Sequence, residues 1–376
     1  MDTKNLVLNC IRHRDNPKIP LMFRAVPAVN EKLINHFKLK DLENDWGEMI
    51  EILGADIFSD GETLGAFTTY IPKYAGPSFE AIYEPNHFFI WGIKPEYINS
   101  GSGKEIIFHK NPPLAKIETP DELRKYKFPE TGWFDFGTYK RVVTAKKESF
   151  EEQKEINPQF LKRSDIYFIN TFCFNSIFMT SIFMRGFENM LMDLLSDRFF
   201  AKKLIDKIGE FYLDFTIKNL DAIGDRLDLY GIWDDFATQD GLMISAEVWR
   251  SYYKPWFSRM IEEIKKYNVM VSFHICGNCS EIIPDLIDMG VDILDPVQTS
   301  AREMDLENLN KNFGKYICFH GGIDAQKLLV KSNPAVIRNE VSKIKKLFKK
   351  NTGIILGPSH YLTNDIPLEN ILAVYK

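Results

Sequence analysis

The chain has 376 residues, of which 45% are hydrophobic and 26% are charged, and its formal net charge is −5. This composition excludes a disordered chain, and an acidic balance spread along the sequence argues against a general binder of nucleic acid or anionic membranes. The N-terminus lacks the long apolar segment of a secretory signal peptide, so we expect a cytoplasmic protein. Five cysteines in a chain of this length do not resemble a disulfide framework, and we expect reduced thiols.

The first 60 residues predict a strand, a helix and a second strand. The apolar run 20–25 predicts a strand that ends near Arg24, and the amphipathic segment 31–53 predicts a helix. Residues 54–60 predict the second strand, which ends at Asp60. This order is the beginning of an alternating α/β pattern.

Residues 61–160, approximately, interrupt that pattern. Prolines are frequent, and the glycine-rich turn 99–103 between the apolar runs 88–91 and 106–108 predicts a hairpin. A capping box that begins at Thr119 predicts the start of a helix. We interpret this segment as an insertion that covers the main fold, rather than as a separate enzyme domain.

After residue 160, strands and helices are predicted to alternate regularly. The predicted strands lie at 166–172, 228–235, 269–275, 291–298, 316–324 and 353–360, and the helices at about 185–223, 246–267, 280–289 and 304–312, then from 333 and from 367. Together with the two earlier strands, this makes eight predicted strands. Most of them are continuous apolar runs, which are typical of a parallel sheet buried on both faces. We therefore predict an α/β protein with one (β/α)8 TIM barrel over residues 1–376.

Nearly every predicted strand ends in polar residues of the kinds that bind ligands or catalyse reactions. In a barrel, the C-terminal ends of all strands surround one mouth, so these side chains would line a single pocket. They are Arg24, Asp60, Asn170, Asp234, Asp235, His274, Cys276, Asp295, Gln298, His320, Asp324, Ser359 and His360.

His274 and Cys276 end one of these strands with a single residue between them. Because side chains alternate along a strand, the two would share a face and could bind a soft metal; the alternative is a core histidine beside a buried thiol. Cys276 and Cys279 form a C-x-x-C, but no thioredoxin-like unit surrounds it. A catalytic zinc site usually has three protein ligands. The candidates for the third are His360, which we favour, Cys279 and, behind these, Asp235 and His320.

Two other groups of residues each allow a functional and a structural interpretation. Asp234 and Asp235 could hold a substrate, or they could cap a helix or remain solvated. The sequence His320-Gly321-Gly322 could offer backbone donors to an anionic ligand, or its glycines could only permit a tight turn.

The motifs resemble, in their order along the chain, those of the uroporphyrinogen decarboxylase (URO-D) superfamily of (β/α)8 barrels, which includes cobalamin-dependent methyltransferases. The resemblance covers most of the chain and is densest from Arg185 onward. Singly the motifs are weak, but their order is specific. They are Asp234-Asp235 with Thr238-Gln239, His274-Ile275-Cys276-Gly277, Asp295-Pro296-Val297-Gln298, Gly321-Gly322-Ile323-Asp324 and Gly357-Pro358-Ser359-His360.

The His-x-Cys motif is most similar to the branch of zinc methyltransferases that exchange a methyl group with a corrinoid protein. The resemblance implies Zn²⁺ as a cofactor, methylcobalamin on a partner protein, and a small thiol, ether or amine as methyl donor or acceptor. In relatives that methylate coenzyme M a cysteine lies near the last strand, where this chain has Ser359-His360. We expect zinc ligands at His274, Cys276 and His360, substrate-orienting residues at Asp234, Asp235 and Asn170, and cofactor contacts at His320, Gly321, Gly322 and Gln298.

Two other functions are compatible with the resemblance. A metal-free decarboxylase would use Asp60, which resembles the catalytic aspartate motif of uroporphyrinogen decarboxylases, together with Arg24. Arg24 is the one arginine in the first strand-to-helix segment, and it poorly matches a substrate with many carboxylates. The other alternative is a non-catalytic protein that binds a corrinoid or tetrapyrrole.

Overall fold

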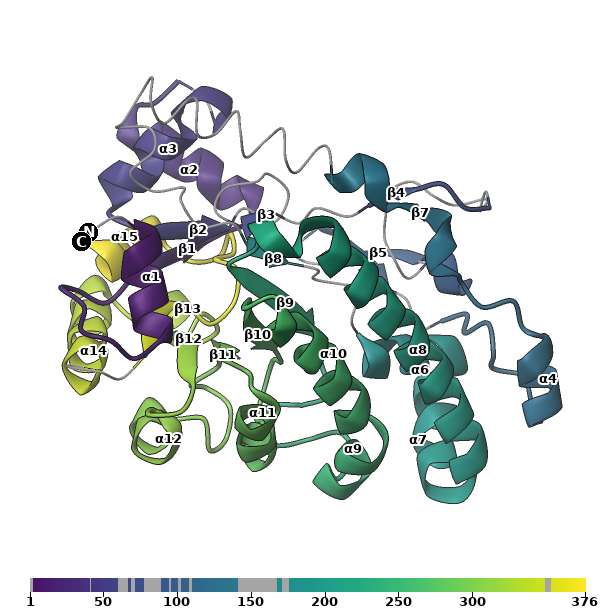
Figure 1. The fold of residues 1–376 in the computed structure, drawn as a ribbon. Helices are drawn as coiled ribbons and strands as arrows, with labels where there is room; N and C mark the ends of the chain where they lie inside the picture. The colour runs from purple at the N-terminus through teal and green to yellow at the C-terminus, as the bar shows by residue number, and fades with distance from the viewer. Residues whose placement is uncertain are drawn as a thin grey trace.

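Parallel strands with helices between them form the frame of the protein (Figure 1). The computed structural model describes residues 3–40, 42–59, 67–68, 72–77, 89–94, 96–100, 103–107, 110–140, 168–170, 176–348 and 353–376. The strands of the frame are β1 (Met22–Arg24), β2 (Ile57–Ser59), β3 (Phe67–Thr68), β8 (Phe168–Asn170), β9 (Leu229–Trp233), β10 (Met270–His274), β11 (Ile293–Val297), β12 (Cys318–Ile323) and β13 (Ile354–Pro358). All eight predicted strands are therefore present, and the short β3 is an addition.

The strands are ordered as a barrel requires. One sheet has the order β13-β12-β11-β10-β9-β8-β3, and all of its pairs are parallel. β1 and β2 form another parallel pair, and a bridge from Leu21 to Leu356 joins this pair to β13. Strand order thus follows chain order, as repeated strand-helix-strand units produce. The described residues contain no pairing between β2 and β3, so the sheet is not closed in the described part of the chain.

Helices cover the outside of the sheet. Figure 1 shows α14, α12, α11 and α10 following one another along it. The helices after β8 are α6 (Ile177–Arg185), α7 (Phe187–Ser196), α8 (Arg198–Ile223), α9 (Ala246–Tyr252), α10 (Lys254–Lys266), α11 (Ile283–Met289), α12 (Leu306–Phe313), α13 (Leu328–Lys331), α14 (Pro334–Leu347) and α15 (Leu368–Tyr375). Their apolar faces pack on the strands and form the main core. Among the described helices, none has both the length and the apolar character to cross a membrane.

Helix α1 (Thr3–Ile11) closes the N-terminal end of the strands. Its side chains Val7, Leu8, Cys10 and Ile11 form an apolar cluster of their own. The other members of this cluster lie at the beginnings of seven strands, at Met22, Ile57, Leu229, Met270, Ile293, Cys318 and Ile355. Strand starts that converge on one helix must be arranged around it, which supports the barrel arrangement. The opposite, C-terminal ends are left to form the mouth.

Three predicted helices are shorter than the sequence pattern indicated. Segment 31–53 contains α2 (Pro27–Phe37) and α3 (Leu42–Leu53), because Lys38 adopts the left-handed conformation with φ of 59°. Gly186, with φ of 91°, separates α6 from α7, and the Asp197 side chain caps α8 by accepting a hydrogen bond from the Phe200 N–H. Likewise 246–267 is divided between α9 and α10. Apolar periodicity can continue through such breaks, so it did not reveal them.

Described parts of segment 61–160 pack on the outer helix α8. The capping box at Thr119 is confirmed and begins α4 (Pro120–Lys125). The predicted hairpin is confirmed by the antiparallel pairing of β5 (Glu96–Ser100) with β6 (Gly103–Ile107). Its first apolar run is wrong, because Phe89–Trp91 is a 3-10 helix. The Trp91 ring lies 5.0 Å from the Phe211 ring of α8. That the whole segment covers the barrel stays a prediction.

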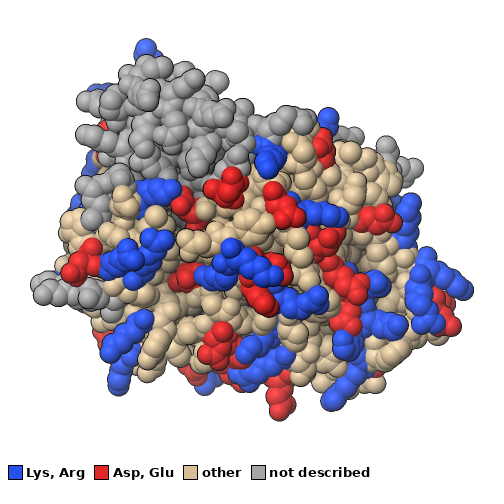
Figure 2. Space-filling view, in the orientation of Figure 1, with Lys and Arg blue, Asp and Glu red and all other residues tan. Residues whose placement is uncertain are grey.

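The surface carries charges of both signs. On the face shown in Figure 2, basic and acidic side chains are interspersed. Several opposite charges are also paired within helices, for example Lys202 with Asp206 and Lys218 with Asp214. Such a mixed distribution weakens the long-range field of the molecule.

Candidate metal centre

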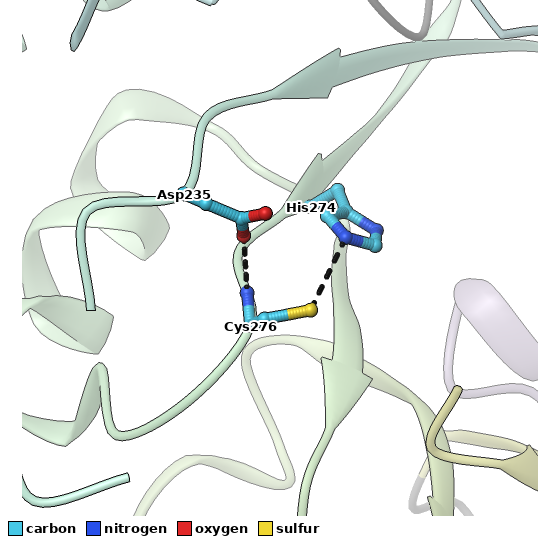
Figure 3. Close-up of side chains that lie close together, drawn as sticks. All are labelled: Asp235, His274 and Cys276. Atoms are coloured by element: carbon cyan, nitrogen blue, oxygen red, sulfur yellow. Dashed lines mark hydrogen bonds between the residues drawn. The ribbon is translucent and has the colours of Figure 1, made fainter. Parts of the chain in front are cut away.

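Three potential metal ligands meet at the C-terminal ends of β9 and β10 (Figure 3). β9 ends at Trp233, two residues before Asp235, and β10 ends at His274, two residues before Cys276. The parallel register pairs Trp233 with His274, so the residues that follow the two strands emerge side by side. The ligand atoms of Asp235, His274 and Cys276 all lie within 4.8 Å of one another.

The geometry orients all three side chains toward a common point. Sγ of Cys276 lies 3.5 Å from Nε2 of His274, and the Cys276 backbone N–H donates a 2.8 Å hydrogen bond to Oδ1 of Asp235. In Figure 3 the side chains of Asp235 and Cys276 both extend toward the His274 ring. Imidazole nitrogen, thiolate and carboxylate are the donors that catalytic zinc sites use, and three of them leave one position open.

A buried carboxylate behind His274 fixes the orientation of its ring. Nδ1 of His274 lies 2.6 Å from Oδ2 of Asp295, and the other oxygen of Asp295 contacts Nδ1 of His320. Carboxylates in this position hold metal-binding histidines with Nε2 facing the metal. The residues at the site therefore fit a zinc ion in donor type and in their supporting contacts.

The charges at the site also depend on Asp295. Burial would raise the pKa of Asp295, but the adjacent His320 and His274 hold it well below its usual range. Burial would likewise lower the pKa of His274, whereas Asp295 and Cys276 raise it to about 10. A metal that binds through Nε2 must therefore displace a proton from His274.

The backbone after β10 is held in one conformation. Gly277 has φ of 96°, and its N–H donates a 2.9 Å hydrogen bond to Oε1 of Gln298, which also accepts from Nε2 of Gln239. Gln298, predicted to contact a cofactor, thus uses its oxygen to position the Cys276-Gly277 segment. This contact explains how a loop residue can present a ligand reproducibly.

Replacing Gly277 with alanine is expected to displace Cys276 and lower zinc affinity by at least ~10-fold. An added Cβ would lie 2.4 Å from the Thr238 carbonyl oxygen, and an alanine would be strained at this positive φ. Zinc titration of the purified variant measures the effect. The matched control is Gly241→Ala in the neighbouring loop, where an added Cβ has no described heavy atom within 4 Å. Equal zinc affinity in the two variants would contradict the role of Gly277.

Asp234 is placed differently from its neighbour Asp235. It is fully buried and accepts hydrogen bonds from the backbone N–H groups of Phe178 and Met179 and from the Ser176 hydroxyl, at the start of α6. Of the alternatives open from the sequence, the structure therefore gives Asp234 the helix-capping position, and Asp235 faces the metal centre. Burial raises the pKa of Asp234 to about 7, against the opposing effect of its hydrogen bonds.

The other candidates for the third ligand lie outside the three-residue group. His360, at the rim, is exposed; desolvation and the nearby charges of Arg24 and His274 lower its pKa. Cys279 is fully buried, and burial raises its pKa to about 12, which disfavours the thiolate that a metal requires. Asp235 is the described residue that completes the group with His274 and Cys276.

Arg24 ends β1 and lies beside the centre. It is 7% exposed, and its guanidinium carbon stacks 4.0 Å from the centroid of the Tyr361 ring. Burial alone would lower the pKa of Arg24, but Tyr361 and Asp295 raise it, so the group stays charged. Among the described residues, Nε of Arg24 has no hydrogen-bond partner. Arg24 therefore offers a buried cationic donor next to the metal centre.

The structure describes less about the remaining predicted site residues. Asp60 lies outside the described residues, and for Asn170 only the backbone, at the end of β8, is described. Gly321 and Gly322 belong to the fully buried β12 and have φ of 100° and 86°. Positive φ angles favour glycine, so the backbone conformation accounts for both residues. Their contact with an anionic ligand stays a prediction.

The sequence placed Asp295 among the residues that line the pocket but gave it no part in the candidate metal site, where it supports His274 in the structure. The available signal was its place at the end of a strand that follows the His274 strand directly in the chain. Neighbouring parallel strands bring such ends together, and register pairs His274 with Asp295. The sequence also predicted no role for Gln239, beyond its place in the motif with Thr238, and none for Tyr361.

Fold and site together define a parallel α/β protein, with strands ordered as in a barrel and a candidate metal centre at the C-terminal ends of the strands. The sequence model of the uroporphyrinogen decarboxylase (URO-D) family matches residues 172–376, more than half of the chain. The chain belongs to this family, whose fold is a TIM barrel.

Individual relatives are distant. A uroporphyrinogen decarboxylase from Chlorobium phaeobacteroides is 22% identical over 175 residues, which are 46% of each chain, and one from Legionella pneumophila is 21% identical over 188 residues, 50% of each chain. The chain thus spans about half the length of the curated relatives it matches. A methyltransferase from Methanosarcina mazei is similar in structure, with a TM-score of 0.60 and 14% identity over 100% of this chain and 97% of that one. At this identity the likeness establishes the fold alone.

Proposed function

We propose that the protein is a zinc-dependent methyltransferase that moves a methyl group between a corrinoid protein and a small-molecule thiol, ether or amine. The observation that carries the proposal is the convergence of Asp235, His274 and Cys276 within 4.8 Å at the barrel mouth. The structural likeness to a methyltransferase is consistent with it. Uroporphyrinogen decarboxylation does not account for such a group of soft and hard donors.

The protein's own residues have separate roles in this proposal. His274, Cys276 and Asp235 hold the ion; Asp295 keeps Nε2 of His274 facing it, and Gln298 holds the loop that presents Cys276. When bound, zinc supplies Lewis acidity that keeps a thiol as its thiolate or polarises the bond from which a methyl group leaves. In this proposal the corrinoid approaches from outside the barrel, on the side where Asp235 and Cys276 are partly exposed.

Elemental analysis and a transfer assay on the full chain test the proposal. We expect about one zinc per chain. With methylcobalamin and 2-mercaptoethanol, we expect the methylated thiol to appear together with the visible spectrum of demethylated cobalamin. A chain that binds no zinc would refute the proposed methyltransferase. A chain that binds methylcobalamin without turnover would also refute it and would indicate a non-catalytic corrinoid carrier.

A metal-free decarboxylase is the second candidate, and Arg24 is the observation that favours it. A buried guanidinium with an unpartnered Nε in the described structure suits a substrate carboxylate. The relatives named uroporphyrinogen decarboxylase point the same way at low identity. Carbon dioxide release from uroporphyrinogen by zinc-free protein, abolished in Arg24→Gln and unchanged in His274→Ala, would establish this function instead.

A further inference from the structure

His274, Asp295 and His320 form a row across three neighbouring strands. The register pairs His274 of β10 with Asp295 of β11, and His320 lies on β12 between the residues paired with Leu294 and Val297. Each carboxylate oxygen of Asp295 contacts Nδ1 of a different histidine. One carboxylate thus orients two imidazole rings, and both Nδ1 atoms carry their hydrogen toward it.

The two rings differ in what their other nitrogen contacts. Nε2 of His274 faces Cys276 Sγ at 3.5 Å. Nε2 of His320 is buried and has no hydrogen-bond partner in the described part of the protein, and the residue as a whole is only 7% exposed. Leaving a buried polar atom without a partner costs about 1–3 kcal/mol, so Nε2 of His320 is open to a partner from outside the described protein.

Arg24 also has an unpartnered buried atom among the described residues, its Nε, and the Arg24 guanidinium interacts electrostatically with Asp295. A guanidinium can donate hydrogen bonds but has no lone pair that accepts a proton. With Nδ1 protonated toward Asp295, Nε2 of His320 has such a lone pair. The two atoms are therefore suited to different tasks, binding for Arg24 and proton transfer for His320.

We propose that His320 carries the proton of the heteroatom that gains or loses the methyl group. This inference rests on the proposed methyl transfer. With a thiol acceptor, the S–H bond breaks, its proton forms an N–H bond at Nε2, and the electron pair stays on sulfur. The thiolate forms the new S–C bond with the methyl group of the methylated corrinoid, and the electron pair of the former cobalt–carbon bond stays with the corrinoid. Asp295 stabilises the resulting imidazolium, and demethylation runs through the same bonds in reverse.

His320→Asn tests the inference, because an asparagine amide can replace Nδ1–H toward Asp295 but lacks Nε2. Calorimetric titration of zinc-loaded protein with 2-mercaptoethanol, in phosphate and in Tris at one pH, counts the protons released to the buffer per thiol bound. We expect His320→Asn to release about one more proton than the wild type, since the bound thiol is a thiolate in both. We also expect its kcat for transfer from methylcobalamin to fall ~100-fold or more with zinc content unchanged.

The exposed His36→Asn is the matched control and should behave as the wild type. Equal proton release by wild type and His320→Asn overturns the inference, as does a wild type that holds zinc but binds no thiol. Loss of zinc from His320→Asn also overturns it, because His320 would then support the metal site. A wild type that binds no zinc at all refutes the proposed function instead, so the two failures are distinguishable.

Discussion

Replacing His274 with alanine is expected to lower zinc affinity by more than ~100-fold and to abolish methyl transfer. Loss of a supporting residue behind a metal ligand typically costs about 10–100-fold, and loss of the ligand itself should cost more. Cys276→Ser is expected to behave similarly, because a hydroxyl is a much weaker zinc donor than a thiolate. Competition with a chromogenic chelator measures the affinities.

Cys279→Ser is the matched control for the cysteine variant. Cys279 is fully buried three residues away and lies outside the group of Asp235, His274 and Cys276, so its variant should keep its zinc. The same titration distinguishes Asp235 from His360 as the third ligand, since Asp235→Ala should lose zinc affinity and His360→Ala should retain it. The reverse order would return His360 to the site and exclude Asp235.

Replacing Asp234 with alanine is expected to destabilise the protein by about 3 kcal/mol with little direct effect on the metal ligands. The substitution leaves the N–H groups of Phe178 and Met179 and the Ser176 hydroxyl without their buried acceptor. Urea unfolding measures the loss. Asp235→Ala is the neighbouring control, and it should reduce zinc binding more than stability.

The raised pKa of Asp234 predicts how its effect changes with pH. In the unfolded chain this carboxyl ionises near its usual value of about 4, whereas in the folded protein it ionises at about 7. Between these values the folded state binds the extra proton, so the contribution of Asp234 to stability is largest at low pH and declines as pH rises toward 7. The stability of Asp234→Asn relative to wild type should therefore increase over this range. A constant difference would contradict the raised pKa.

Much of the fold was predictable because it depends on local patterns. Continuous apolar runs separated by amphipathic segments predicted eight strands, and all eight are present. The capping box at Thr119 was readable because both partners lie three residues apart. Helix breaks at Lys38 and Gly186 were missed, because they change the backbone direction without interrupting the apolar pattern.

The candidate site was only partly predictable. His274 and Cys276 are two residues apart, so their proximity follows from local geometry. The contact between His274 and Asp295 spans 21 residues, and that between Asp234 and Phe178 spans 56. Such contacts depend on which strands are neighbours and on their register, and spacing in the sequence does not contain this information.

The sequence alone predicts the class of this protein, the order of its strands along the chain and the His-x-Cys pair, since apolar periodicity and short motifs are local properties. The partners of His274 and Cys276 depend on the tertiary structure. Parallel register brings Asp235 to the candidate metal centre and Asp295 behind it, and it places Asp234 under α6. Two adjacent aspartates thus have different environments, because consecutive side chains leave the end of a strand in different directions.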